Sequence, residues 1–113
     1  MDNLSEGSLV NAELSIGRHP AIVLSTEEEI KTDGKVRVVG ISSNTTISLP
    51  EDRIAIPPGL NLPKKCYVQC EVLETLHLRE VESRHRKAFG PFFEKVKKQV
   101  KAVVERRKKS TQS

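Results

Sequence analysis

The chain has 113 residues, 36% of them hydrophobic and 30% charged, and carries a formal net charge of +4. This length and balance indicate one globular domain with a modest core. Aromatic residues make up only 4%, which disfavours RNA binding through a platform of exposed rings. No apolar run approaches the length of a membrane span, and the acidic start is unlike a signal peptide, so we expect no membrane segment and a cytoplasmic location.

The positive charge is concentrated near the C-terminal end of the sequence. Residues 84–109 carry a net charge of +9, whereas the rest of the chain carries −5. A basic end on a mildly acidic body is typical of proteins that bind phosphate backbones or an acidic partner. The alternative is a lysine-rich helix face that only aids solubility, and the composition favours neither.

Two cysteines, Cys66 and Cys70, are four residues apart in a predicted strand. This spacing places both thiols on the same face as Val68, where they are most simply small core residues. A metal site would need two more ligands, and His77 is the only candidate nearby in the sequence. We therefore expect no metal and no cofactor.

The predicted elements are short and bounded by turn residues. Residues 15–18 form the predicted connection between the first two strands, which is short enough for a hairpin loop. Ser25 is the predicted N-cap of one helical turn at 26–30, with Glu28 completing a capping box. A second turn of helix is predicted at 76–81, and the broken alternation at Val38-Val39 predicts a bulge. Strands are predicted at 7–14, 20–24, 35–41, 53–56, 65–73 and 83–89, with a short edge segment at 47–49.

The most regular helical pattern begins at Gly90-Pro91 and predicts an amphipathic helix over about 91–107. Short strands closed by one such helix predict a mainly β (α+β) fold, a small β-barrel with a C-terminal helix. We expect residues 1–6 to form a leader, residues 7–109 a single domain, and residues 110–113 a flexible tail. The apolar stripe of the helix consists of Phe92, Phe93, Val96, Val100, Val103 and Val104.

A basic pair, Arg18 and His19, precedes Pro20 and an unbroken apolar run. Proline is tolerated at the first residue of a strand and holds the residue before it extended. Both side chains are therefore predicted at the mouth of a rigid strand, where a scaffold can hold reactive groups. The alternative is a solvated loop before a core strand.

The order of these segments resembles the PemK/MazF (Kid-like) toxin family of bacterial toxin–antitoxin modules. The resemblance extends from about Gly7 to Arg107, and it depends on the order and spacing of several short motifs. These are a glycine-containing first strand, the Arg18–Val23 stretch, a strand that ends in Ile41-Ser42-Ser43, Gly59-Leu60 before the Lys65–Glu71 strand, and a final glycine with an amphipathic helix.

This resemblance implies an SH3-like barrel, a homodimer, and a partner antitoxin whose acidic tail covers the active groove. It also implies a metal-independent endoribonuclease that cuts single-stranded RNA. In that reaction a ribose 2′-OH attacks the adjacent phosphorus and leaves a cyclic phosphate and a free 5′-OH. The chemistry needs a base, an acid, and donors that stabilise the phosphorane charge.

The resemblance also assigns roles to particular residues. The basic residue before the family's proline falls on His19, which would act as acid or base, and Arg18 beside it would hold phosphate. The hydroxyl after the isoleucine falls on Ser42, and Glu71 lies in the family's carboxylate region as a candidate base. The RNA-binding residues implied by the loop and by the basic strand are Ser43, Asn44, Arg84, Arg86 and Lys87.

Three features depart from the family pattern. Leu73 occupies a position where the family often carries a catalytic arginine, His19 replaces the usual arginine before the proline, and the connection from Gly7 to Pro20 is shorter than usual. The missing arginine favours a second hypothesis, a catalytically degenerate barrel that binds RNA or an acidic peptide without cleavage. A third, inhibition of a protein target such as a topoisomerase, has no residue in its favour.

Overall fold

The structure, a computed structural model, describes residues 4–60, 62, 65–88 and 90–111. The strands are β1 (Ser8–Leu14), β2 (Gly17–Val23), β3 (Lys35–Ser42), β4 (Arg53–Ala55), β5 (Tyr67–His77) and β6 (Val81–Lys87). The helices are α1 (Glu27–Asp33) and α2 (Gly90–Thr111), with short 3₁₀ turns η1 (Pro50–Asp52) and η2 (Leu78–Glu80).

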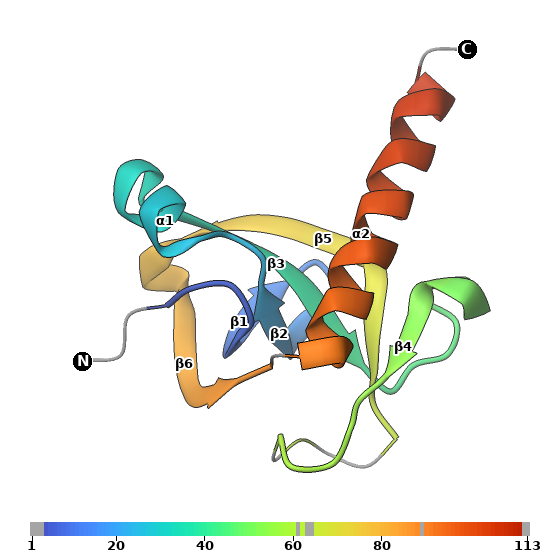
Figure 1. The fold of residues 1–113 in the computed structure, drawn as a ribbon, viewed down its shortest axis with the longest axis horizontal. Coiled ribbons are helices and arrows are strands. Elements are labelled where there is room, and N and C mark those ends of the chain that lie inside the picture. The colour runs from blue at the N-terminus through green and yellow to red at the C-terminus, as the bar shows by residue number, and fades with distance from the viewer. Residues whose placement is uncertain (1–3, 61, 63–64, 89, 112–113) are drawn as a thin grey trace.

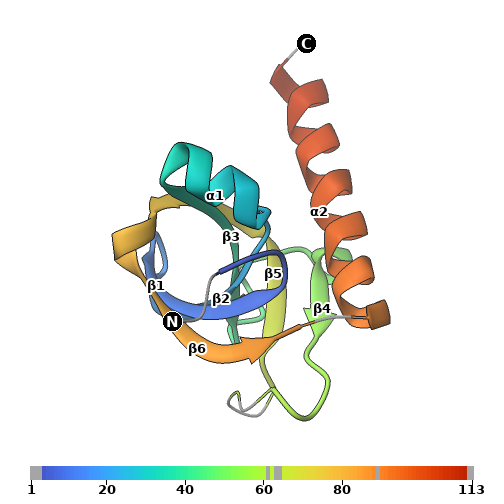
Figure 2. The same ribbon diagram turned by 60° about the vertical axis from the view of Figure 1, so that its left-hand side comes forward.

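All six strands form one antiparallel sheet in the order β4-β5-β3-β2-β1-β6. The sheet curls into an open barrel, and α2 stands beside it with its C-terminal end extending past the strands (Figures 1 and 2). The predicted mainly β fold with a C-terminal helix is therefore confirmed. Residues 1–3 of the expected leader, Phe89 and residues 112–113 lie outside the described residues.

The β1–β2 hairpin is tighter than predicted. Gly17 has a φ of +103°, which glycine adopts without strain, and it pairs directly with Leu14. The predicted connection at 15–18 therefore shrinks to two residues, and Arg18 and His19 lie within β2 rather than in a loop before it. Pro20 lies where the ladder to β3 ends, because β2 pairs with β3 only from Ala21 onward, so its missing N–H breaks no bond there.

The cap of α1 lies one residue later than predicted. The hydroxyl of Thr26 accepts a bond from the Glu29 amide (3.1 Å), and the Glu29 carboxylate accepts one from the Thr26 amide (2.9 Å). The Thr26 backbone amide, and after it the Thr26 side chain, lower the pKa of the Glu29 carboxyl by hydrogen bonding to it. Ser25, the predicted cap, instead accepts a bond from the Arg37 amide of β3 (2.9 Å). The expected pairing of Ser25 with Glu28 was therefore wrong.

Two other segments differ from their predictions. Ile47–Leu49, the predicted edge segment, lies in a loop that leads into η1. β5 continues to His77, past the predicted end at 73, because Lys35–Val39 of β3 pairs with its second half. The helical turn predicted at 76–81 is the shorter η2. At the other end of the chain, α2 continues past the predicted end at 107 to Thr111.

An irregular step in the β3–β5 ladder bends β5. Val39 pairs with Leu73, whereas the next residue, Gly40, pairs with Gln69. The bulge predicted in β3 is thus present at this step, but the extra residues belong to β5. At Gly40 the chains approach so closely that a Cβ atom would lie 2.9 Å from side-chain atoms of both Leu14 and Val72.

Buried side chains form two clusters, one on each face of the sheet. The first includes Phe93, Val96 and Val103 of α2, and the second includes Ile30 of α1. Cys66 and Cys70 are buried free thiols in the first cluster, as expected for core residues. Burial, together with the charge of Asp52, raises the pKa of Cys70 to about 12.

Candidate functional site

The start of β2 and the end of β3 meet at one end of the sheet because the two strands are antiparallel. Their pairing ends at Ala21 and Gly40; His19 lies two residues before Ala21, and Ser42 lies two residues after Gly40. Side chains opposite each other in such a register point to the same face. His19 is half-buried, and Ser42 is 5% exposed. The structure therefore brings these two candidate catalytic residues to the same end and face of the sheet.

Arg18 points to the other face of β2. It follows the regular β1–β2 register, opposite Glu13, whereas His19 lies opposite Ala12, and successive strand residues alternate between faces. The guanidinium lies 3.6 Å from the Glu82 carboxylate, in an exposed pair that contributes little to stability. The structure does not bring Arg18 and His19 together on one face.

The loop that follows Ser42 is held by hydrogen bonds. The buried amide of Gln69 donates to the backbone oxygens of Ser42 and Asn44, at 2.9 Å each. The Asn44 side chain accepts bonds from the amide and hydroxyl of Thr46, and Ser43 is exposed beside it. Because the Ser42 oxygen accepts a bond from the Asn44 amide (3.1 Å), its own proton is not used there. This loop is a preformed support for the Ser42 hydroxyl.

Gln69 was missed by sequence reasoning. Its one signal is a polar residue between Val68 and Cys70 in a strand that is otherwise buried. A buried amide is favourable where it forms hydrogen bonds; the two loop carbonyls accept from its Nε2, whereas its buried Oε1 has no hydrogen-bond partner among the described residues.

The basic residues of β6 lie along an edge of the sheet. The register between β1 and β6 shifts after Ser83, and His85 has a φ of +56°. Arg84 donates to the side chain of Asn11 (2.8 Å), Arg86 to the backbone oxygen of Gly59 (3.3 Å), and Lys87 to the hydroxyl of Ser5 (2.8 Å). In the sheet, β1 lies between β6 and β2. These cations are therefore one strand away from His19 and not next to His19 or Ser42.

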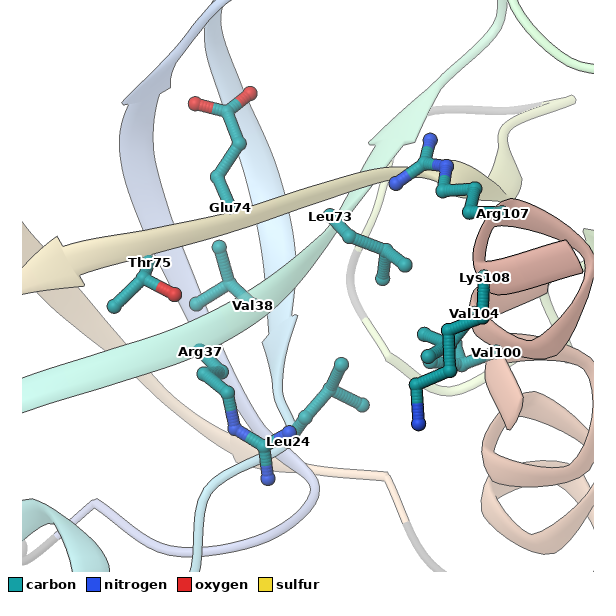
Figure 3. A pocket seen from close by; sticks show the side chains of 10 residues that line it. All are labelled: Leu24, Arg37, Val38, Leu73, Glu74, Thr75, Val100, Val104, Arg107 and Lys108. Carbon is teal, nitrogen blue, oxygen red and sulfur yellow. The ribbon is translucent and has the colours of Figure 1, made fainter. Parts of the chain in front are cut away.

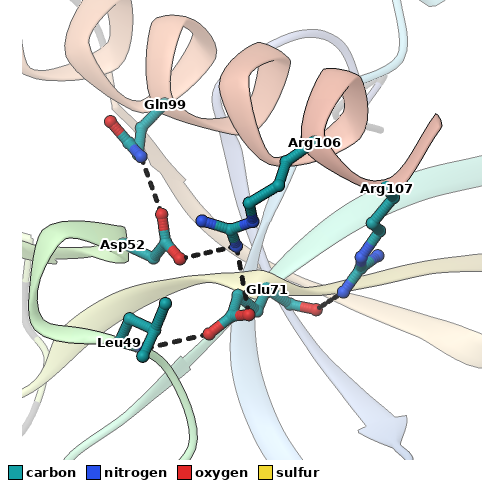
Figure 4. Close-up of polar contacts among 6 residues, drawn as sticks. All are labelled: Leu49, Asp52, Glu71, Gln99, Arg106 and Arg107. Atoms are coloured by element: carbon teal, nitrogen blue, oxygen red, sulfur yellow. Dashed lines mark hydrogen bonds and ion pairs between the residues drawn. The ribbon is translucent and has the colours of Figure 1, made fainter. Parts of the chain in front are cut away.

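Glu71 belongs to a polar network beneath α2 (Figure 4). Its carboxylate accepts bonds from the Leu49 amide (2.9 Å) and from Arg106 (3.2 Å). Arg106 also donates to the fully buried carboxylate of Asp52 (2.8 Å), which accepts a second bond from Gln99 (2.7 Å). The bond to Asp52 raises the pKa of Arg106. Both carboxylate oxygens of Glu71 are thus bonded, one to the loop before β4 and one to α2.

Leu73, the residue at the family's arginine position, packs against the first core cluster and faces α2. It lies on β5, on the far side of β3 from β2. In this chain the family's arginine position therefore holds an apolar side chain that packs against α2.

Among the described residues, no three His, Cys, Asp or Glu side chains are grouped in a way that could hold a metal ion. None of the helices in the described part of the chain has the length and apolar character needed to cross a membrane.

Comparison with solved structures identifies the fold. MazF (Form-I) from Deinococcus radiodurans matches with a TM-score of 0.78 and 18% identity, over 93% of this chain and 99% of that one. An endoribonuclease in complex with its cognate antitoxin, from Mycobacterial species, matches with a TM-score of 0.76 and 17% identity, over 90% and 95%. A MazE-MazF complex (Form-II) from Deinococcus radiodurans matches with a TM-score of 0.73 and 20% identity, over 92% and 97%.

The chain therefore has the fold of MazF toxins, and the resemblance to the PemK/MazF family is confirmed at the level of fold. No protein-family model matches the sequence, and no curated protein matches it either.

Proposed function

We propose that this protein is a MazF-like toxin, an endoribonuclease that cleaves single-stranded RNA without a metal ion and is inhibited by an acidic antitoxin. The observation that carries the proposal is the fold, which matches that of MazF over 93% of this chain; the proposal places its chemistry on His19 and Ser42, near the adjoining ends of β2 and β3. The proposal includes a homodimer in the cytoplasm, built from a single domain over residues 7–109.

In the proposed reaction the ribose 2′-oxygen forms a bond to phosphorus, and the bond from phosphorus to the 5′-oxygen breaks. A base accepts the 2′-OH proton, and an acid gives a proton to the leaving 5′-oxygen. His19 fills one of these two roles, because histidine exchanges protons near neutral pH. The Ser42 hydroxyl donates to a phosphate oxygen as negative charge develops on the phosphorane.

The remaining candidates bind RNA around this pair. Arg18 lies on the other face of β2, so its proposed contact is with a phosphate flanking the cut. Ser43 and Asn44 contribute donors from the loop, and the β6 cations Arg84, Arg86 and Lys87 attract the backbone. Both carboxylate oxygens of Glu71 already accept bonds, one from the Leu49 amide and one from Arg106. Its proposed part is therefore to hold α2 and the loop before β4 in place.

A second function, RNA binding without cleavage, is favoured by a specific observation. Leu73 cannot donate to a phosphate, and Glu71 is bonded to Arg106 rather than directed to His19. A site with only His19 and Ser42 holds fewer catalytic groups than the reaction uses.

One experiment separates the two functions. The purified protein is incubated with a long single-stranded RNA in excess EDTA, and the fragment ends are mapped. Discrete cuts with cyclic-phosphate and 5′-OH ends support the nuclease. RNA that stays intact, together with binding that weakens steeply with salt, supports the binding protein instead.

A further inference from the structure

A hollow of about 270 Å³ lies where the start of β1 pairs with the end of β6. Ser8 and Lys87, which are opposite each other in that ladder, both line it. Ala12, the partner of His19, lies four residues further along β1, about 14 Å along the strand at about 3.4 Å per residue. The hollow is therefore a second surface, separate from the candidate catalytic residues.

A bulge in β6 shapes one side of this hollow. Between the pairs that β6 makes with Ser8 and with Val10, β1 has one residue and β6 has three, residues 84–86. His85, in the middle of the bulge, has a φ of +56°, a conformation that residues other than glycine rarely adopt. Bulges and such conformations are common at binding sites, where they redirect side chains. The bulge brings His85 and Arg86 to the lining of the hollow.

Three serine hydroxyls in the lining each accept a hydrogen bond from this chain. Ser8, which is buried, accepts one from the Ser5 amide at 3.0 Å. Ser83 accepts one from the His85 amide at 3.0 Å, and Ser5 accepts one from the Lys87 ammonium at 2.8 Å. A hydroxyl that accepts a bond keeps its one proton to donate elsewhere. The hollow therefore offers three hydroxyl protons to a ligand.

Cationic side chains add to these donors. Lys87 uses one of its three N–H groups on Ser5, and Arg86 uses one of its five on the Gly59 carbonyl (3.3 Å). Among the described residues that line the hollow, none carries a carboxylate that would compete for them. The larger groove between α2 and the sheet differs, because the Glu74 carboxylate is part of its lining (Figure 3). The hollow beside β6 is thus suited to an anion that only accepts hydrogen bonds.

The number of donors indicates which anion fits. Three hydroxyls, an ammonium and a guanidinium are more donor groups than the roughly four acceptor positions of a carboxylate. A phosphate monoester has three terminal oxygens and nearly two negative charges at neutral pH, whereas a phosphodiester has two terminal oxygens and one charge. None of the described lining residues is aromatic, so no ring is present on which a base could stack.

We propose that this hollow binds a phosphate monoester and recognises the phosphate rather than the base. The serine hydroxyls and the Lys87 ammonium donate to the terminal oxygens, and the Arg86 guanidinium pairs with them from the rim. The phosphate belongs either to a free mononucleotide or to the 5′ end of an RNA strand. Binding here does not depend on the nuclease activity proposed above, and it gives Arg86 and Lys87 a more specific ligand than the RNA backbone.

The test is an NMR titration of the full chain in about 150 mM NaCl, which screens diffuse attraction between exposed charges. The ligands are UMP, AMP, uridine and dimethyl phosphate. We expect UMP and AMP to bind with affinities within about twofold of each other and to shift the amides of Ser5, Ser8 and Ser83. Uridine and dimethyl phosphate should bind at least about tenfold more weakly.

A second titration distinguishes the two sources of the phosphate. It uses one short 2′-O-methyl RNA with a 5′-phosphate and the same RNA with a 5′-OH, neither of which can be cleaved by attack of a 2′-OH. Binding of the phosphorylated strand that is at least about tenfold tighter assigns the site to RNA ends. Equal binding of the two strands, together with binding of UMP, assigns the site to free mononucleotides.

Three variants test the residues. Ser83→Ala removes a hydroxyl without changing the charge and should weaken UMP binding at least about threefold. Lys87→Gln should weaken it at least about fivefold. Lys98→Gln makes the same charge change at an exposed position of α2 and should change it less than about twofold. Circular dichroism confirms that each variant folds.

Three results would overturn the inference: no binding of UMP, equal binding of dimethyl phosphate, or equal losses of affinity in Lys87→Gln and Lys98→Gln. RNA cleavage by the same preparations, without added ligand, tests the proposed function separately. Cleavage without UMP binding contradicts the phosphate site alone, whereas UMP binding without cleavage contradicts the nuclease alone.

Discussion

Asp52 is the buried charge on which the attachment of α2 depends, and we predict that Asp52→Asn destabilises the protein by about 2 kcal/mol. The carboxylate is fully buried. One of its oxygens accepts from Gln99 (2.7 Å) and the other from Arg106 (2.8 Å). Asparagine has the same shape but only one acceptor oxygen, so either orientation turns an N–H toward one of the two donors.

The size of this effect follows from two opposing contributions. A hydrogen bond to a charged group contributes about 1.5–3 kcal/mol, and the unpaired donor adds a desolvation penalty. Against this, asparagine removes the cost of burying a charge. The Arg106 side chain is 44% exposed, so water can solvate the guanidinium once the bond is lost. The net loss in stability therefore stays near the lower end of the range of about 1.5–3 kcal/mol.

Urea unfolding followed by circular dichroism measures the free energy of unfolding directly. Glu51→Gln is the matched control, since it removes a carboxylate from the neighbouring exposed residue and should change stability by less than about 0.5 kcal/mol. Arg106→Leu combined with Asp52→Asn should cost less than the sum of the two single changes. Additive effects, or a loss for Asp52→Asn no larger than for Glu51→Gln, would refute the network.

Two further predictions concern the core. Gly40→Ala should lower the free energy of unfolding by about 1–2 kcal/mol in the same urea assay. The reason is that the added Cβ would lie 2.9 Å from side-chain atoms of Leu14 and Val72. Unchanged stability would contradict this close packing and would mean that β5 can move away. Burial raises the pKa of Cys70 from 9.0 to about 12, so its contribution to stability is complete below about pH 9 and is lost as the pH rises toward 12. Cys70→Val should therefore gain about 1–2 kcal/mol relative to the wild type between about pH 8 and pH 10.5, and a pH-independent difference would contradict this.

Local sequence patterns predicted most of the sheet. The strands at 8–14 and 35–42 follow from apolar alternation, which depends on neighbours in the chain. The end of β5 and the loop at 47–49 were mispredicted because strand length there is set by pairing with distant residues. Thr26 caps α1 instead of Ser25 because the Ser25 hydroxyl accepts a hydrogen bond from the Arg37 amide. Sequence spacing does not reveal this contact.

The candidate site was predictable only in part. The motif around Pro20 and the hydroxyl after Ile41 pointed to His19 and Ser42, and the antiparallel pairing of β2 with β3 places both near the same end of the sheet. The opposite orientation of Arg18 follows from strand alternation, but only once β2 is known to begin at Gly17. The network around Asp52 had no sequence signal, since its partners lie 47 and 54 residues away.

RNA cleavage in excess EDTA, measured for the wild type and for His19→Ala, tests whether His19 is catalytic; His77→Ala, at the far end of β5, is the control. We expect cyclic-phosphate and 5′-OH ends from the wild type and the control, and at least about a hundredfold slower cleavage by folded His19→Ala. Cleavage by His19→Ala at the wild-type rate would contradict the assignment of the His19–Ser42 pair as the active site.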